Sequence, residues 1–358
     1  MKTAVINTSS LPFFRFFAAC VVVFFHFGQK IEFYPQVPAI FKTGSLMVTF
    51  FFVLSGFVLF LGYHQKERVS WLHYFCKRAI RILPLYFLAF FLSAGFLALS
   101  GQLSWLEFVL NFFCLQSWFP QPLSLNFTSW FVSDLLFFYC VFPFILFFLK
   151  KIQPSGTTMM MVGLSVWAMT QGLLIKLLNT DFYTGYPSWS YDLIYYFPLS
   201  HFCSFFMGIC GAYYVRMSDL RAQQGGVVSL LTTVIIFSAV GVMVQLQPEL
   251  VKLVGFKIPF ASSFYAPIVL LLIFHLTLTH NPLLKMLSWQ RFVLWGEMSY
   301  ALFILQAPMD RLYKYVSPEY GIMHPGISFV LFFVVLISVA FLVTLVEKPI
   351  VRRLKISV

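Results

Sequence analysis

Charged residues are scarce in this sequence. They make up only 10% of the 358 residues, whereas hydrophobic residues make up 60%. An ordinary soluble domain has about 25% charged and about 45–50% apolar residues. The apolar residues also form long blocks instead of alternating with polar ones. A soluble domain is therefore excluded, and the sequence predicts an all-α, polytopic membrane protein.

Paired cysteines and clustered charges are also missing. The six cysteines form no Cys-x-x-Cys pair, so we expect neither a disulfide framework nor a metal site. The net charge is +12, but the charged residues lie between the hydrophobic blocks, where they set the membrane topology. We therefore expect no nucleic-acid partner. No small-residue cleavage site follows the first apolar block, which indicates a retained helix and not a signal peptide.

Ten apolar runs are long enough to cross a hydrocarbon core of about 30 Å, which takes roughly 17–25 helical residues. We see no internal repeat and expect a single membrane-embedded domain over residues 1–358, with no appended soluble domain. The predicted spans are 11–28, 44–62, 80–99, 130–149, 157–178, 193–215, 227–247, 259–279, 292–308 and 326–346.

One further apolar segment, 105–118, is short and carries Glu107, Asn111 and Gln116. If it crossed the membrane, every later loop would be inverted and most basic residues would face outward, against the positive-inside tendency. We therefore expect a re-entrant or interfacial segment here, about ten crossings, and both termini in the cytoplasm. The basic residues predicted to be cytoplasmic are Lys2, Lys66, Arg68, Lys77, Arg78, Arg81, Lys150, Lys151, Arg216, Arg221, Lys285, Arg291, Lys348, Arg352, Arg353 and Lys355.

Two polar residues belong to the first predicted span. Arg15 and His26 are eleven residues apart, which places them on one helix face, about 16 Å apart along the axis. Polar residues inside membrane helices tend to face a cavity or a partner. Arg15 would then hold an anionic group near the cytoplasm, and His26, which titrates near neutral pH, would take a proton near the outer end. The structural alternative is that Arg15 snorkels to the inner headgroups and His26 caps the helix.

Two other motifs have both a structural and a functional interpretation. Arg78 and Arg81 are three residues apart and share a face at the cytoplasmic start of the third span. They either set topology or form a pair of guanidinium groups for phosphates. Ser55 and Gly56 lie in the second span, where small residues usually allow close helix packing.

Taken in order along nearly the whole chain, these residues resemble the acyltransferase-3 family of multi-span O-acyltransferases. Arg15 and His26 match its Arg, ten residues, His pattern, and Arg78 and Arg81 match its Arg-x-x-Arg motif. The other matching stretches are "FFFVLSGF" at 50–57, "LQSWFP" at 115–120, "SW" at 129–130, "FYCVFP" at 138–143, "FFMGICGAYY" at 205–214, "GEMSYALFILQAPM" at 296–309 and "VEKPIVRRL" at 346–354.

The resemblance implies transfer of an acyl group, usually acetyl, from cytoplasmic acyl-CoA to a hydroxyl, often on a surface polysaccharide or a lipid-linked glycan. Acyl-CoA, a saccharide and membrane lipids would be the partners, with no bound cofactor, and the bacterial inner membrane would be the location. His26 would be the general base and Arg15 catalytic, with Arg78 and Arg81 binding CoA. Residues of lesser weight, for acceptor binding, hydroxyl relay or orientation of His26, are Ser55, Trp130, Ser133, Asp134, Tyr139 and Tyr300.

Two positions depart from the family pattern. Where many members have Glu five residues after the Trp, this chain has Leu135, with Asp134 one place earlier. Where many have a late His, it has Gln306, which can form hydrogen bonds but does not titrate. The sequence leaves open whether transfer is direct or uses an acyl-enzyme.

Two other functional classes suit a polytopic protein. A secondary transporter or flippase for a lipid-linked or anionic metabolite would also use intramembrane Arg and His, but we see no related halves or paired broken helices. A channel would need a ring of polar pore residues, which is not evident. The O-acyltransferase is therefore the function that the sequence favours, with the transporter as the alternative.

Overall fold

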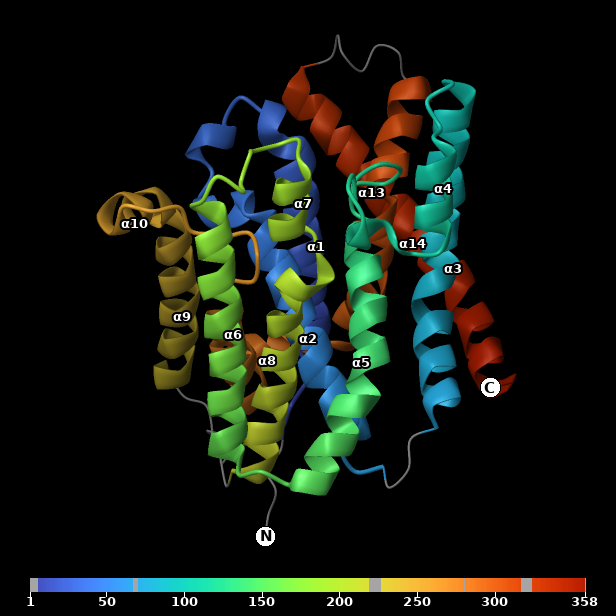
Figure 1. Ribbon diagram of the computed structural model, residues 1–358. Helices are drawn as coiled ribbons and strands as arrows, with labels where there is room; N and C mark the ends of the chain where they lie inside the picture. Colours follow the sequence, from blue (N-terminus) through green and yellow to red (C-terminus); the bar gives the residue numbers. More distant parts are fainter. Residues whose placement is uncertain (1–5, 67–69, 219–226, 280, 317–323, 358) are drawn as a thin grey trace.

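The computed structural model describes residues 6–66, 70–218, 227–279, 281–316 and 324–357. Throughout these ranges the chain is a bundle of helices without a β-strand (Figure 1). Long helices satisfy all their backbone hydrogen bonds internally, which an apolar chain in a bilayer requires. The predicted all-α fold is confirmed.

Seven segments in the described ranges are long and apolar enough to cross a membrane, or eight if the bent pair formed by α9 and α10 counts as one span. The protein is therefore a multi-pass membrane protein, while the number of ten crossings stays a prediction. The remaining two predicted spans correspond to α11 (Ala266–Leu278), which has only 13 residues, and α13 (Gln290–Val316). The seven segments are α1 (Leu11–Phe27), α2 (Gly44–Tyr63), α3 (Trp71–Leu99), α5 (Trp130–Ile152), α6 (Gly156–Leu178), the pair α7 (Trp189–Tyr195) and α8 (Pro198–Met217), and α14 (Pro325–Ser357).

One proline divides a predicted span, and another bends the chain directly after a second span. Pro198 begins α8, and Phe197 before it is extended, as residues that precede proline usually are. Pro248 lies in the first turn of α10 (Gln247–Val254), which is bent by 57° from α9 (Val227–Gln245). In Figure 1, α10 consequently lies across the top of α9. The short α12 (Pro282–Leu287) precedes α13.

The segment 105–118 does not cross the bundle, as the sequence predicts. It forms α4 (Trp105–Phe112), about 12 Å long, followed by one 3₁₀ turn, η4 (Gln116–Trp118). The Tyr86 hydroxyl donates a hydrogen bond to the Asn111 carbonyl at 2.5 Å, which fastens α4 to α3. The segment therefore stays at one end of the bundle, beside the end of α3 (Figure 1).

Helix α2 is the centre of the bundle and packs against α1, α5, α8 and α11. Glycines allow its closest contact. A Cβ at Gly56 would lie 2.0 Å from the Phe205 carbonyl oxygen, and a Cβ at Gly208 would lie 2.0 Å from the Val53 carbonyl oxygen. Gly56 and Gly208 thus let α2 and α8 pack backbone to backbone, which agrees with the packing interpretation of the Ser55-Gly56 pair.

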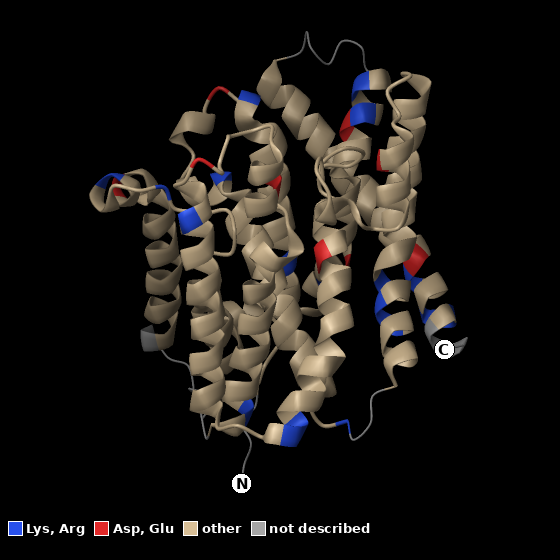
Figure 2. Cartoon of the chain, viewed as in Figure 1, with Lys and Arg blue, Asp and Glu red and all other residues tan. Residues whose placement is uncertain are grey.

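Most Lys and Arg residues in Figure 2 lie near the ends of the helices, and long stretches between them carry no charge. This distribution agrees with a membrane protein. The side chains of Lys2, Arg68, Arg221 and Lys355, which contribute to the predicted orientation, lie outside the described part of the chain. The cytoplasmic location of both termini stays a prediction.

Candidate functional site

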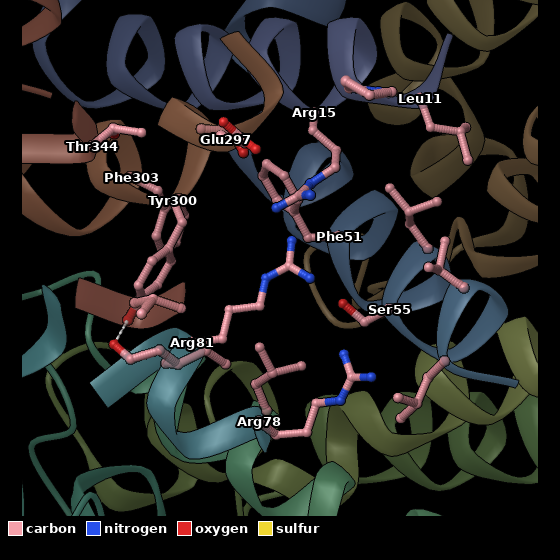
Figure 3. Close-up of a pocket in the computed structure, with 18 of the residues that line it drawn as sticks. Leu11, Arg15, Phe51, Ser55, Arg78, Arg81, Glu297, Tyr300, Phe303 and Thr344 are labelled. Carbon is pink, nitrogen blue, oxygen red and sulfur yellow. Dashed lines mark hydrogen bonds between the residues drawn. The ribbon is translucent and has the colours of Figure 1, made fainter. Parts of the chain in front are cut away.

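A cavity of about 500 Å³ lies between α1, α2, α3, α5, α13 and α14 (Figure 3). Six of the residues singled out in the sequence line it, namely Arg15, Ser55, Arg78, Arg81, Tyr139 and Tyr300. Residues that are up to 285 positions apart in the sequence thus meet in one space, since Arg15 and Tyr300 both line it. The structure therefore gives the Arg-x-x-Arg motif and the first helix a shared location.

Basic side chains dominate the polar lining of this cavity. The guanidinium groups of Arg15, Arg78 and Arg81 point into the same space (Figure 3), and Lys348 and Arg352 of α14 also line it. Within the described residues, none of these three arginines has a carboxylate within 4.0 Å. Glu297 and Glu347 also line the cavity, but five basic side chains outnumber them, and guanidinium groups that form no salt bridge are available to bind an anion.

Two aromatic rings and one carboxylate hold the basic groups in place. The Arg78 guanidinium lies 5.2 Å from the centre of the Tyr63 ring and 6.0 Å from that of Tyr74, both cation–π contacts. Lys348 Nζ lies 2.7 Å from Glu297 Oε2 and so links α14 to α13. Arg78 is thereby oriented without being neutralised.

Helix α5 turns one face to the cavity and another to the bundle. Phe131, Leu135 and Tyr139, spaced four residues apart, line the cavity. Asp134 is fully buried outside it, and in the described structure neither of its carboxyl oxygens has a hydrogen-bond partner. Asp134 therefore does not line the cavity, and the neighbouring residue that does is Leu135.

Two other residues of α5, Trp130 and Ser133, also lie outside the cavity lining. Trp130 packs its ring 5.1 Å from His201 of α8, and Ser133 accepts a hydrogen bond at 2.7 Å from the Ser117 hydroxyl. Neither residue lines the cavity. The structure thus separates Trp130, Ser133 and Asp134 from Tyr139, although all four belong to one stretch of sequence.

Tyr300 lines the cavity, but its hydroxyl is already bonded. It donates to the Ile82 carbonyl oxygen at 3.0 Å, as the dashed line in Figure 3 shows. Tyr300 therefore ties α13 to α3 across the cavity and is not in contact with His26.

His26 lies beyond the cavity and is bound to Gln306 of α13. Nδ1 of His26 is 2.8 Å from Gln306 Oε1, and the amide nitrogen of Gln306 donates to the Phe303 carbonyl at 2.7 Å. Because Oε1 can only accept, this network assigns the hydrogen to Nδ1. The neutral imidazole then has its lone pair on Nε2, which is the form that a general base needs.

The loop before α5 covers His26. The Phe127 ring lies 4.7 Å from the imidazole, edge to face. Its neighbours fix the loop on α13, since Asn126 Nδ2 donates to the Ile304 carbonyl at 2.9 Å and Arg311 donates to the Leu125 carbonyl at 2.7 Å. His26 is therefore held between α13 and this loop, partly buried.

Sequence reasoning missed several lining residues of the cavity. Glu297 and Phe303 lie within the "GEMSYALFILQAPM" motif, and Lys348 and Arg352 lie within "VEKPIVRRL". Both motifs matched the family, so the sequence indicated that these two segments matter. It did not indicate which of their residues face the cavity. No group of three or more His, Cys, Asp or Glu side chains in the described residues is arranged to hold a metal ion.

Comparisons with known proteins identify the family of the chain. The chain is similar to Acyltransferase MdmB of Streptomyces mycarofaciens, with 34% identity over 158 residues, or 40% of this chain. The match spans about 40% of the length of that curated relative. No solved structure matches the chain. The model of the acyltransferase-3 family, described as an acyltransferase domain, matches residues 9–346, and the chain therefore belongs to this family.

Proposed function

We propose that the protein is a membrane O-acyltransferase that transfers an acyl group, acetyl in the simplest case, from acyl-CoA to a saccharide hydroxyl. The observation that carries the proposal is the cavity in which Arg15, Arg78 and Arg81 converge and, among the described residues, form no salt bridge. Membership of the acyltransferase-3 family supports the reaction class.

The donor matches the cavity by charge. CoA carries several phosphate oxygens, and guanidinium groups bind such oxygens through paired hydrogen bonds. Arg352 of α14 adds positive charge, while Lys348 is paired with Glu297. The end of the bundle that holds Arg78 and Arg352 is the one predicted to be cytoplasmic, where acyl-CoA is available. Acyl-CoA would thus bind from the cytoplasm, with its phosphates near these residues.

His26 is the proposed general base. The acceptor hydroxyl oxygen attacks the thioester carbonyl carbon, and Nε2 of His26 takes the hydroxyl proton. The carbon–sulfur bond breaks, and CoA leaves as a thiolate that receives the proton back from the imidazolium. Hydroxyls have a high pKa, so a positioned base accelerates this attack. An outward-facing saccharide, such as an exopolysaccharide or O-antigen precursor, would bring its hydroxyl from the His26 end.

The test uses purified protein in detergent with acetyl-CoA labelled in its acetyl group. A mixture of methyl hexosides serves as the acceptor probe. We expect one free CoA for each labelled acetyl transferred, and Lys151→Ala, outside the cavity, as a control with unchanged rate. A protein that neither binds nor consumes acetyl-CoA, yet carries labelled substrate across liposome membranes, would be a transporter and would refute the proposal.

A further inference from the structure

Three phenylalanines line the end of the cavity that is nearest to His26. Helices α2 and α5 run in the direction opposite to α13, and the lining residue nearest to the His26 end is Phe51 on α2, Phe131 on α5 and Phe303 on α13. Three helices therefore place the same type of side chain at the same level of the cavity. At that level the lining changes from basic and polar to wholly aromatic.

The three rings contact one another. Their centres are 5.0 Å apart for Phe131 and Phe303, 6.0 Å for Phe51 and Phe303, and 6.1 Å for Phe51 and Phe131. All three side chains are buried, with exposed fractions of 9% or less. Two of the pairs meet edge to face and the Phe131–Phe303 pair is tilted, and such aromatic contacts are stabilising. The rings thus form a packed apolar wall, which we call the aromatic floor.

The floor lies at the end of the cavity that is nearest to the base. Gln306 lies three residues beyond Phe303 on α13 and holds His26, and neither of these two residues lines the cavity. Leu54 and Leu135 line the walls next to the floor, so the position where many family members have Glu is apolar here. The three phenylalanines of the floor and these two leucines are apolar, so none of the five can donate a hydrogen bond to a ligand at the deep end of the cavity.

From this geometry we infer that Phe51, Phe131 and Phe303 form the subsite for the acyl group and limit its length. The inference rests on the proposed function, in which the phosphates of acyl-CoA bind at Arg78 and Arg81. With the phosphates at the basic end, the acyl group is the part of the molecule that reaches the deep end. An apolar floor favours an alkyl group, and its close packing leaves room for a short one only.

A longer acyl chain must displace a ring from the floor. Each methylene that an apolar pocket admits or rejects changes binding by roughly tenfold. Replacing Phe303 by Ala removes a ring that contacts both other phenylalanines, and the space left is apolar and suited to an alkyl chain. Phe303→Ala should therefore admit acyl groups that the unchanged protein rejects.

The experiment compares the dissociation constants of acetyl-CoA and hexanoyl-CoA by titration calorimetry. The proteins are the wild type, Phe303→Ala, Phe131→Ala and the control Phe138→Ala. Phe138 is on the same helix as Phe131 and fully buried, but it does not line the cavity. The ratio of two constants within one protein does not depend on the folded fraction of the sample. Turnover with the same two donors gives a second ratio.

We expect the wild type to bind hexanoyl-CoA at least about tenfold more weakly than acetyl-CoA. Phe303→Ala and Phe131→Ala should shift this ratio at least about tenfold towards hexanoyl-CoA, and Phe138→Ala should leave it unchanged. Equal ratios in all four proteins would overturn the subsite while leaving the acyltransferase proposal intact. Absence of binding and turnover with either donor would instead refute the proposed function, and the subsite with it.

Discussion

The two ends of α1 differ in almost every physical respect. Arg15 lies in a cavity of about 500 Å³ among other basic groups, whereas His26, eleven residues later, is held by Gln306 and covered by Phe127. The first region is open and charged, and the second is closed and has one defined hydrogen bond. A single helix thus carries a region suited to binding an anion and a region suited to moving a proton.

Under the proposed function, this difference assigns binding and chemistry to separate groups. A cation binds phosphate best when no salt bridge occupies it, and among the described residues Arg15, Arg78 and Arg81 form none. A base must keep its lone pair and its orientation, which the Gln306 contact provides. Substitutions in the first region should therefore affect donor affinity, and substitutions in the second should affect turnover.

The largest effect is expected for His26→Asn. The Asn amide can donate to Gln306 as Nδ1 does but has no counterpart of the basic Nε2. Acyl transfer should fall by about 10³-fold, within the usual range for loss of a general base. The measurement is turnover with labelled acetyl-CoA at equal membrane expression, and a rate close to that of wild type would exclude His26 as the base.

Loss of one cavity arginine should have the next largest effect. We expect Arg78→Ala and Arg81→Ala to raise the dissociation constant of acetyl-CoA by about 10–100-fold, the usual cost of a charge-assisted hydrogen bond. Turnover at saturating donor should change much less. Lys151→Ala, at the same predicted side but outside the cavity, is the control. If Arg78→Ala, Arg81→Ala and Lys151→Ala bound acetyl-CoA with equal affinity, CoA would bind outside this cavity.

Gln306→Leu should have a smaller effect, confined to turnover. The substitution keeps the approximate size of the side chain but removes the acceptor at 2.8 Å from Nδ1. Without it the imidazole can rotate or take the other tautomer, and we expect turnover to fall by about tenfold. Acetyl-CoA affinity should not change. A changed affinity with normal turnover would show that Gln306 acts on the donor and not on His26.

Asp134→Asn should have the smallest effect. The carboxyl group is fully buried, has no hydrogen-bond partner in the described structure and lies outside the cavity. Turnover should therefore remain within about twofold of wild type, and thermal stability should not fall, because a buried carboxyl without a partner is costly. A large loss of turnover in a folded variant would bring Asp134 into the reaction.

Apolar run length predicted the helices of the bundle well where the runs end in polar residues. The predicted spans 11–28, 44–62 and 157–178 agree closely with α1, α2 and α6. Composition predicted less where helices continue beyond the apolar run, as α3 does by starting at Trp71, nine residues before the predicted start. Charged residues such as Arg78 remain helical there because their long side chains reach polar surroundings.

The composition of the site was easier to predict than its orientation. Family motifs identified Arg15, Arg78 and Arg81, and the structure brings these side chains together. On α5, apolar residues surround the helix, so no amphipathic pattern shows which face is turned to the cavity. The sequence could not indicate that Leu135, and not Asp134, faces the cavity, nor that Gln306 contacts His26 across 280 residues.

Acetyl-CoA binding to the His26→Asn protein, measured together with turnover in the same sample, tests the account most directly. Because the donor cavity and the base are separate, the dissociation constant should equal that of the wild type while turnover is almost abolished. Loss of binding in a folded His26→Asn protein, or wild-type turnover, would contradict the division of the site into a basic donor cavity and a proton-transfer region.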